Sequence, residues 1–364
     1  MSIRTEFREN RLLWLLAAVP ALFAIERLAG EAHTVLFVVS VLAIVPLATL
    51  LSRATESVAA RTGDAVGGLL NATLGNLTEL VIALTALRAG MLDLVKASIA
   101  GAIVTNSLFM LGMALLLGGL RHHVQEYNRA TARLQVSMLF LAAIAMLVPS
   151  VIAVSDRPGA AGVVEELSIG LSVLLLVAYV LGLLFSLRTH RELFAGAQHG
   201  DAGKEDVWPI GVAATVLAVV TLLVALVSEV FVESVQQAAV TFGMTPAFVG
   251  FIVVALVGAA AEMTAAFSAA RKGRLDLSIG IALGSSSQIA LFVAPVLVLA
   301  SLVIAPAPMT LHFWPGAVAT ILIATFAVSF VVNSGRSGWF VGVQLLVVYL
   351  TFAMTLYLVP PVVK

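Results

Sequence analysis

Two glutamates stand inside long apolar stretches of the sequence, where a charged side chain is costly to hold. Glu79 lies within residues 66–88 and Glu262 within residues 245–270, and both stretches are otherwise almost free of charge. A carboxylate at the centre of a bilayer costs about 2.5–3.5 kcal/mol on insertion scales. Acidic residues at such positions usually mark ion or proton pathways. The pair is therefore a candidate cation- and proton-binding site.

Polar side chains and glycines accompany each glutamate at helical spacing. Asn76 precedes the first glutamate by three residues and shares its helix face, and Asn106 lies in the next apolar stretch. In the second half of the chain, Ser285 and Gln288 share a face in the stretch after the second glutamate. Glycine permits a local helix break that turns carbonyl oxygens toward a cavity. The glycines placed to do so are Gly75 and Gly258.

The side chains gathered in this way offer oxygen ligands alone. They comprise two carboxylates, amide oxygens and hydroxyls, to which backbone carbonyls and water can be added. The chain has no cysteine, and its six histidines lie in joints or at the ends of apolar stretches. An all-oxygen set suits a hard cation such as Ca²⁺ and suits Zn²⁺ or Cu²⁺ poorly. We expect Glu79 and Glu262 to bind a transported metal ion, and we expect no resident cofactor.

The composition requires that these stretches cross a membrane. Of the 364 residues, 61% are hydrophobic and 11% are charged, and the mean hydropathy is +1.08. Soluble domains average about a quarter charged residues, so this chain cannot hide its apolar surface in a globular core. The formal net charge of zero argues against a nucleic-acid partner. The sequence predicts an all-α integral membrane protein whose partners are the lipid bilayer, a hard cation and protons, and it leaves the oligomeric state open.

Apolar runs separated by short polar joints predict about eleven transmembrane helices, since one span needs ~20 apolar residues. Two further acids, Glu56 and Glu229, stand nearer the membrane surface, where they line either a vestibule or a solvated interface. The expected spans are 12–29, 33–51, 66–88, 93–118, 132–154, 166–187, 208–230, 245–270, 276–303, 313–332 and 338–359.

An internal repeat relates the two halves of the chain. An offset of 183 residues places 75–79 on 258–262 without a gap, and it matches Glu, Arg, Gly and Asp as well as Leu and Ala. Five spans separate equivalent points, an odd number, so the two halves cross the bilayer in opposite senses, as in many secondary transporters. The predicted organisation is an extra N-terminal transmembrane helix (1–32), a first five-helix repeat (33–188), a cytoplasmic linker (189–207) and a second five-helix repeat (208–364).

The distribution of basic residues predicts the orientation. If the N-terminus is cytoplasmic, the inside segments hold 15 lysines and arginines and the outside segments hold 5. Under the positive-inside rule, this split favours a cytoplasmic N-terminus and, with eleven spans, a C-terminus outside. We expect a multi-pass protein of a bacterial-type inner or plasma membrane.

The motifs around the glutamates resemble those of the CAX-type Ca²⁺/H⁺ antiporters, the cation/proton exchanger branch of the calcium/cation antiporter superfamily. The resemblance rests on Gly-Leu-Leu-Asn-Ala-Thr-Leu-Gly-Asn-Leu-Thr-Glu (68–79), on Val-Gly-Ala-Ala-Ala-Glu (257–262) and on the stretch from Leu275 through Gly284 to Pro295. It implies a secondary active transporter rather than an enzyme. It also implies that Glu79 and Glu262 bind Ca²⁺ or protons, supported by Asn76, Asn106, Ser285 and Gln288.

Two positions depart from the second motif usual in that family, Gly-Asn-Ala-Ala-Glu-His. This chain has Ala259 in place of the asparagine and Met263 in place of the histidine. The missing asparagine removes one oxygen ligand or water anchor, which bears directly on the cation preference.

The pair of glutamates suggests how the transport of a cation is coupled to the transport of protons. Two glutamates a few ångströms apart cannot both stay ionised without a compensating cation, so the cation and protons occupy the site in turn. Alternating access then exposes the site to one side of the membrane at a time.

Other functions use the same residues. A Na⁺/Ca²⁺ exchanger of the related branch usually has proline before the repeat glutamate, where this chain has Thr78 and Ala261. Exchange of Na⁺, K⁺ or Mn²⁺ for H⁺ is possible on the same helical scaffold. A channel is a further alternative, which saturable, proton-dependent ion flux would exclude. An intramembrane hydrolase requires a base beside Ser285–Ser287, and these serines can instead bond to their own helix.

Overall fold

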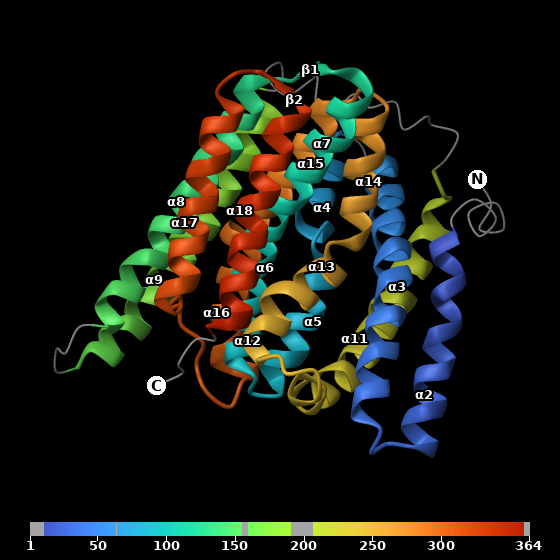
Figure 1. The fold of residues 1–364 in the computed structure, drawn as a ribbon. Helices are drawn as coiled ribbons and strands as arrows, with labels where there is room; N and C mark the ends of the chain where they lie inside the picture. Colours follow the sequence, from blue (N-terminus) through green and yellow to red (C-terminus); the bar gives the residue numbers. More distant parts are fainter. Residues whose placement is uncertain (1–10, 63, 155–158, 191–206, 360–364) are drawn as a thin grey trace.

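The computed structural model describes residues 11–62, 64–154, 159–190 and 207–359, which form a bundle of long helices (Figure 1). Among them, eight helices are long and apolar enough to cross a membrane, and two bent pairs raise the number to ten if each pair is one span. The predicted all-α membrane architecture is confirmed. The eleventh predicted span, 12–29, consists of η1 (Arg11–Ala17) and α2 (Ala18–Leu28), and the count of eleven stays a prediction.

Both halves of the chain contain the same order of elements, as the sequence offset predicts. Each half has a long helix, a bent pair, a long helix interrupted by a π-helix, and two more helices. The first half comprises α3 (His33–Arg61), α4 (Asp64–Leu74) with α5 (Leu77–Arg88), α6 (Leu92–Val104) with η2 (Thr105–Met110) and α7 (Leu111–His122), α8 (Arg129–Ala153), and α9 (Ala160–Leu184) with η3 (Phe185–Thr189).

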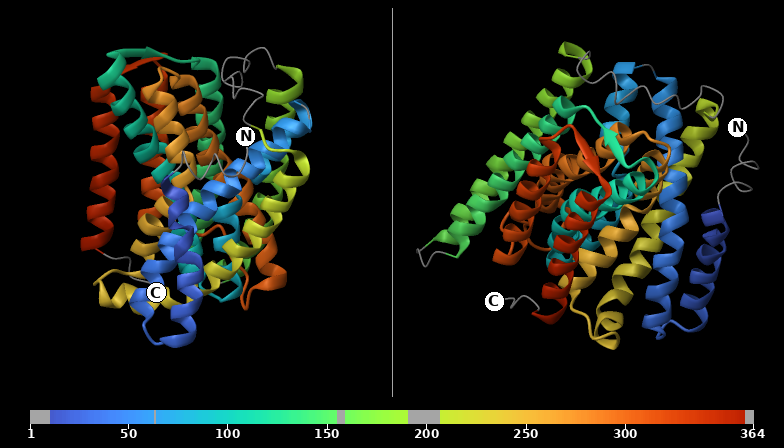
Figure 2. Two further views of the ribbon diagram at one scale, coloured as in Figure 1. Left: turned by 90° about the vertical axis from the view of Figure 1, so that its right-hand side faces the viewer. Right: turned by 45° about the horizontal axis from the view of Figure 1, so that its top comes forward.

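The second half repeats this order from α11 onward. It comprises α11 (Ile210–Thr241), α12 (Pro246–Phe248) with η4 (Val249–Val254), α13 (Ala255–Gly258) and α14 (Ala260–Arg271), α15 (Leu275–Gln288) with η5 (Ile289–Val293) and α16 (Ala294–Ile304), α17 (Pro315–Val332), and α18 (Trp339–Leu358). Helices α3 and α11 continue past their predicted ends at 51 and 230, because the charged and amide side chains there are exposed on the surface of a continuing helix. Helices α3 and α11 pack side by side, as the view of Figure 1 and the two views of Figure 2 agree.

The two bent pairs lie at the centre of the bundle with their breaks facing each other. The segment Val66–Leu74 is bent by 44° from α5, and Pro246–Gly258 is bent by 58° from α14. In Figure 1, α4 and α14 occupy the upper half of the bundle, and α5 and α13 occupy the lower half. The chain therefore passes the two breaks in opposite directions, which brings the first turns of α5 and α14 together.

Glycine allows the two halves to approach closely along α6. A Cβ atom on Gly101 would lie 2.1 Å from the carbonyl oxygen of Phe251, and one on Gly250 would lie 2.7 Å from the Cβ of Ala97. Small residues of this kind are common where membrane helices meet, because they let backbones touch. The contact holds η4 of the second half against the helix that leads to Asn106.

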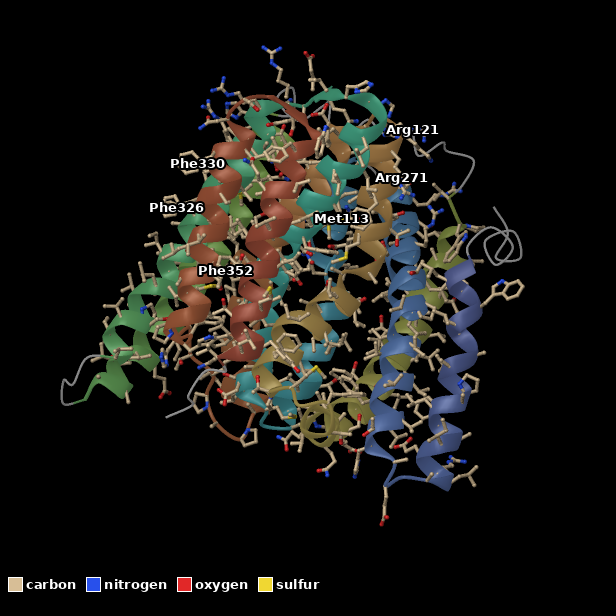
Figure 3. All side chains as sticks on the ribbon, viewed as in Figure 1. Met113, Arg121, Arg271, Phe326, Phe330 and Phe352 are labelled. Atoms are coloured by element: carbon tan, nitrogen blue, oxygen red, sulfur yellow. The ribbon has the colours of Figure 1, made fainter. Side chains whose placement is uncertain are left out.

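One end of the bundle carries most of the described basic residues and a small sheet. Strand β1 (Val124–Glu126) pairs antiparallel with β2 (Arg336–Gly338) at this end, and Figure 3 places Arg121 and Arg271 there as well. The two halves are tied together beside the sheet, where Gln125 Nε2 donates to the carbonyl oxygen of Ala270 at 3.2 Å. The predicted linker, 189–207, lies almost entirely outside the described residues.

Candidate cation-binding site

The two glutamates begin the helices that follow the breaks. Glu79 lies in the first turn of α5 and Glu262 in the first turn of α14, where the helix dipole favours negative charge. The two carboxyl groups lie close enough to interact electrostatically across the two halves. Among the described residues, Glu79 Oε1 and Glu262 Oε2 are buried without a hydrogen-bond partner. A buried acceptor without a partner is costly, so these oxygens are available ligands.

Each helix break contains a glycine at a position where a Cβ atom would lie close to neighbouring atoms. A Cβ atom on Gly258 would lie 2.9 Å from Glu79 Cγ and 3.3 Å from Glu79 Oε1. The Glu79 side chain thus packs directly on the backbone of the opposite break. A Cβ atom on Gly75 would lie 2.7 Å from the carbonyl oxygen of Asn71 and 3.5 Å from Gln288 Oε1. The sequence-predicted break glycines therefore lie in contact range of residues from the other half.

Four neutral side chains form a continuous hydrogen-bond network beside the acids. Asn76 Nδ2 donates to Gln288 Oε1 at 2.7 Å, and Ser285 Oγ donates to Asn76 Oδ1 at 2.6 Å. Asn106 Nδ2 donates to Ser285 Oγ at 2.9 Å. The structure therefore brings the four predicted supporting residues together, two from each half of the chain.

Two π-helices lie next to network residues. Asn106 lies in η2, and Gln288 directly precedes η5; such segments occur often at functional sites. Asn106 Oδ1 is a third buried acceptor without a partner among the described residues. The described residues contain no cluster of three His, Asp or Glu side chains. A cation here would therefore be bound by two carboxylates and neutral oxygens.

The network occupies one side of the pseudo-symmetric site. The offset of 183 residues relates Asn76, Ser285 and Asn106 to Ala259, Ala102 and Ile289, which are buried and apolar. It relates Gln288 to Thr105, whose Oγ1 donates instead to Tyr349 Oη at 3.2 Å.

A small cavity touches Glu79 on the apolar side. Its volume is about 10 Å³, the size of one water molecule, and its lining includes Ala102, Val254 and Ile289. One face of the site thus offers polar ligands, and the other is lined by apolar side chains and by Ser98, whose hydroxyl donates to the carbonyl oxygen of Val95.

The two candidate vestibule acids lie on exposed helix surfaces. Glu56, on α3, accepts a hydrogen bond from Ser52 Oγ at 3.3 Å and pairs with Arg53 at 3.8 Å. Glu229 is exposed on α11. Neither belongs to the four-residue network.

The serine run divides into one network residue and two packing residues. Ser286 Oγ donates to the carbonyl oxygen of Ala282 and Ser287 Oγ to that of Gly284, each at 2.9 Å. These are bonds to their own helix, one of the two interpretations that the sequence allowed. Among the described residues, no histidine hydrogen-bonds to any of the three serines.

Two tyrosines reach the site helices and were not among the candidates from the sequence. Tyr179 Oη, from α9, donates at 2.7 Å to the carbonyl oxygen of Ala72, close to the first break, and Tyr349 Oη bonds to Thr105. The signal that could have identified them is their chemistry, because a tyrosine buried among apolar side chains usually needs a partner for its hydroxyl.

Comparison with known proteins gives one consistent relationship. The family described as sodium/calcium exchanger protein matches residues 32–188 and 212–358. The chain is 37% identical to the Ca²⁺/H⁺ antiporter of Synechocystis sp., covering 96% of this chain and 98% of that protein. It is 38% identical to the Ca²⁺/H⁺ antiporter ChaA of Bacillus subtilis, covering 96% and 99%.

Among solved structures, that of native YfkE matches with a TM-score of 0.82 and 35% identity, covering 96% of this chain and 100% of the other. The resemblance predicted from the two glutamate motifs is thereby confirmed. The chain belongs to the sodium/calcium exchanger protein family.

Proposed function

We propose that this protein is a secondary active transporter that exchanges Ca²⁺ for H⁺, with Glu79 and Glu262 binding either the cation or protons. The observation that carries the proposal is the pair of glutamates from opposite halves, each with a buried oxygen that has no hydrogen-bond partner in the described part of the chain. It is supported by relatives that are named as Ca²⁺/H⁺ antiporters and that align over almost the whole chain.

Charge balance explains why the two ions exclude each other. Two ionised carboxylates carry two negative charges, which one Ca²⁺ or two protons neutralise. Holding both would leave excess positive charge in a site surrounded by apolar side chains, and holding neither would leave two like charges unbalanced. The pair should titrate as a unit. A site that is stable only when filled by one ion or the other couples the two fluxes.

The network residues have a supporting role in this proposal. Asn76, Asn106, Ser285 and Gln288 hold their oxygens in fixed positions through mutual hydrogen bonds, and Asn106 Oδ1 remains free as a ligand. Ca²⁺ takes about six to eight oxygen ligands. Water and backbone carbonyls at the breaks would complete the set, because the apolar side of the site supplies none.

The apolar positions also define the nearest alternative. Ala259 provides no side-chain amide where the usual family motif has asparagine, and the loss of this oxygen ligand or water anchor bears on which cation the site prefers. Exchange of Mn²⁺, Na⁺ or K⁺ for H⁺ on the same scaffold is therefore the second candidate. We place the N-terminus and the basic end of the bundle in the cytoplasm and the C-terminus outside, in a bacterial-type inner or plasma membrane.

Transport by vesicles and liposomes tests the proposal. Glu79→Gln and Glu262→Gln are each expected to abolish Ca²⁺ uptake driven by a pH gradient into everted vesicles, because a neutral amide can neither balance the cation nor release a proton. Glu165→Gln, at an exposed position of α9, is the matched control and should transport normally. Near-normal uptake by either site variant would refute the mechanism.

Purified protein in liposomes identifies the cation. Proton flux stimulated by Ca²⁺, Mn²⁺, Na⁺ and K⁺ in turn should be largest with Ca²⁺. Uptake driven by a sodium gradient without a pH gradient would instead assign Na⁺/Ca²⁺ exchange.

A further inference from the structure

A groove opens between α8 and α17 on the outer surface of the bundle, at its basic end. Its volume is about 440 Å³, and its lining includes Arg133, Ser137 and Phe140 from α8 and Phe326 from α17. Asn333, directly after α17, completes its upper end. In Figure 3 the labelled side chains of Phe326 and Phe330 point away from the bundle on this face. Because the chain crosses a membrane, an outward-facing groove of this kind is exposed to lipid.

Two guanidinium groups converge at the upper end of the groove. Arg133 Nε donates to Asn333 Oδ1 at 3.0 Å, and Arg129 Nη2 approaches the same oxygen at 3.5 Å. Neither arginine forms an ion pair with a carboxylate in the part of the chain that the structure describes. Each guanidinium carries five N–H donors. One amide oxygen therefore leaves most of these donors, and both positive charges, for an acceptor from outside the protein.

The lower end of the groove is aromatic. The rings of Phe140 and Phe326 lie with their centroids 5.9 Å apart, and their side chains are 41% and 51% exposed. Residues 133 and 140 are about two helical turns apart, or ~10 Å along α8. The exposed face continues toward the middle of the helix with Ile144 and Val148. A ligand in this groove would meet positive charge at one end and an apolar wall below it.

We propose that the groove binds an anionic phospholipid, with its phosphate on Arg129 and Arg133 and one acyl chain along Phe140 and Phe326. Basic pockets between transmembrane helices on the cytoplasmic side suit anionic lipid headgroups, and guanidinium groups bind phosphate in a forked geometry. A free phosphate would use only the arginines. The phenylalanines directly below them match the acyl chain that a phospholipid brings to the same place.

Native mass spectrometry of the delipidated protein tests this assignment. Phosphatidylglycerol and phosphatidylcholine with identical acyl chains are added separately, and bound lipid is counted at each concentration. The parent protein should bind phosphatidylglycerol more tightly. The double variant Arg129→Gln/Arg133→Gln should weaken that binding by about tenfold or more, since each basic residue near the surface attracts the anionic headgroup. Phe326→Ala should also weaken it, because the acyl chain loses its wall.

The control removes the same charge at the same end of the bundle. Arg121→Gln/Arg271→Gln, which Figure 3 places away from the labelled Phe326 and Phe330, should bind phosphatidylglycerol within about twofold of the parent protein, because neither arginine lines the groove. Equal losses in the two double variants would overturn the proposal by showing a general charge effect. Unchanged lipid binding with a changed oligomeric mass in the groove variant would assign the groove to contact between copies of the chain instead.

Discussion

At the scale of single residues, Asn76 is the centre of the polar network. Its amide donates to Gln288 and accepts from Ser285, so it joins the first half of the chain to the second with both of its polar atoms. Its pseudo-symmetric mate is Ala259, which has no such group. One residue therefore fixes the positions of two others on the polar side of the site, while nothing equivalent operates on the apolar side.

Replacing Asn76 should weaken cation binding strongly. Asn76→Leu keeps the volume but leaves Gln288 Oε1 and the hydroxyl of Ser285 without their partner, at a cost of about 1–3 kcal/mol for each buried group. The apparent KM for Ca²⁺ in vesicle uptake should rise by roughly ten- to a hundredfold, since 1.4 kcal/mol is about tenfold in affinity.

The mate of Gln288 provides the control for this experiment. Thr105→Val removes the bond to Tyr349 outside the network and should change the KM by less than about twofold, because the hydroxyl that it removes bonds to Tyr349 and not to a network side chain. If Thr105→Val raised the KM for Ca²⁺ as much as Asn76→Leu, the loss of any buried hydrogen bond would account for the effect. The network would then have no specific role in cation binding.

His312, in the connection between α16 and α17, should make stability depend on pH. Burial and the nearby positive charge of Lys96 lower the pKa of His312. As the pH falls, the imidazole of His312 therefore binds a proton in the unfolded chain before it does so in the folded chain. Stability is therefore highest above the ordinary histidine pKa of about 6.5 and falls as the pH drops below it.

Thermal unfolding in detergent measures this contribution. Lowering the pH from about 7.5 to about 5.5 should reduce the melting temperature less in His312→Gln than in the parent protein, because the variant has no imidazole to protonate in the unfolded state. Equal reductions in the two proteins would mean that the titration of other groups accounts for the whole effect.

At the scale of elements, close approach of helices is what holds the two halves in register. Gly101 on α6 touches the backbone of Phe251 in η4, and Gly258 in the second break touches Glu79. Neither position has room for a side chain. The helices that carry the site are therefore placed by backbone contact, which leaves little freedom in the separation of the two glutamates.

A methyl group at Gly101 should separate these elements. In Gly101→Ala the added Cβ would lie 2.1 Å from Phe251 O, so α6 and η4 must move apart, and the melting temperature in detergent should fall by several degrees. Gly170→Ala, on α9 with no atom within 4 Å of the added Cβ, should hold or raise it, since alanine is favoured over glycine in a helix by up to about 1 kcal/mol. Equal melting temperatures for the two variants would show that α6 and η4 can move apart to accommodate the methyl group without loss of stability.

At the scale of the whole molecule, the inverted halves give the bundle one basic end. The ends of α7 and α14 and the starts of α8 and α15 lie together there with the small sheet (Figure 1). Arg27, Arg88 and Lys96 are the basic residues described in the segments predicted to lie outside. On the positive-inside rule, we propose that the richer end faces the cytoplasm.

Cysteine labelling tests this orientation cleanly, because the natural chain has no cysteine. A membrane-impermeant maleimide added to intact cells should label Thr241→Cys, at the far end of α11, and should label Arg121→Cys only after permeabilisation. Val173→Cys, at a lipid-facing position in the middle of α9 that is 49% exposed, should stay unlabelled in both conditions. The reverse pattern for the first two variants would invert the assigned orientation.

The membrane class, the duplication, the inverted sense of the halves and the pair of acids in apolar stretches could all be predicted from the amino-acid sequence. Each of these features depends on a pattern along the sequence: the length of the apolar stretches, the repeat at a fixed offset, or a charged residue within an apolar stretch. The candidate network residues were also identified from sequence, because an amide or hydroxyl within an apolar helix is conspicuous whatever surrounds it.

Which of these residues contact one another could not be predicted in this way and depends on how the helices pack. Asn76 bonds to Gln288 across 212 positions, and Glu56 and Glu229 lie exposed, because the rotation of each helix about its axis is set by packing against other helices. The one-sided character of the site and the groove between α8 and α17 have the same origin. Both depend on side-chain directions across two helices, and no pattern within a single helix specifies them.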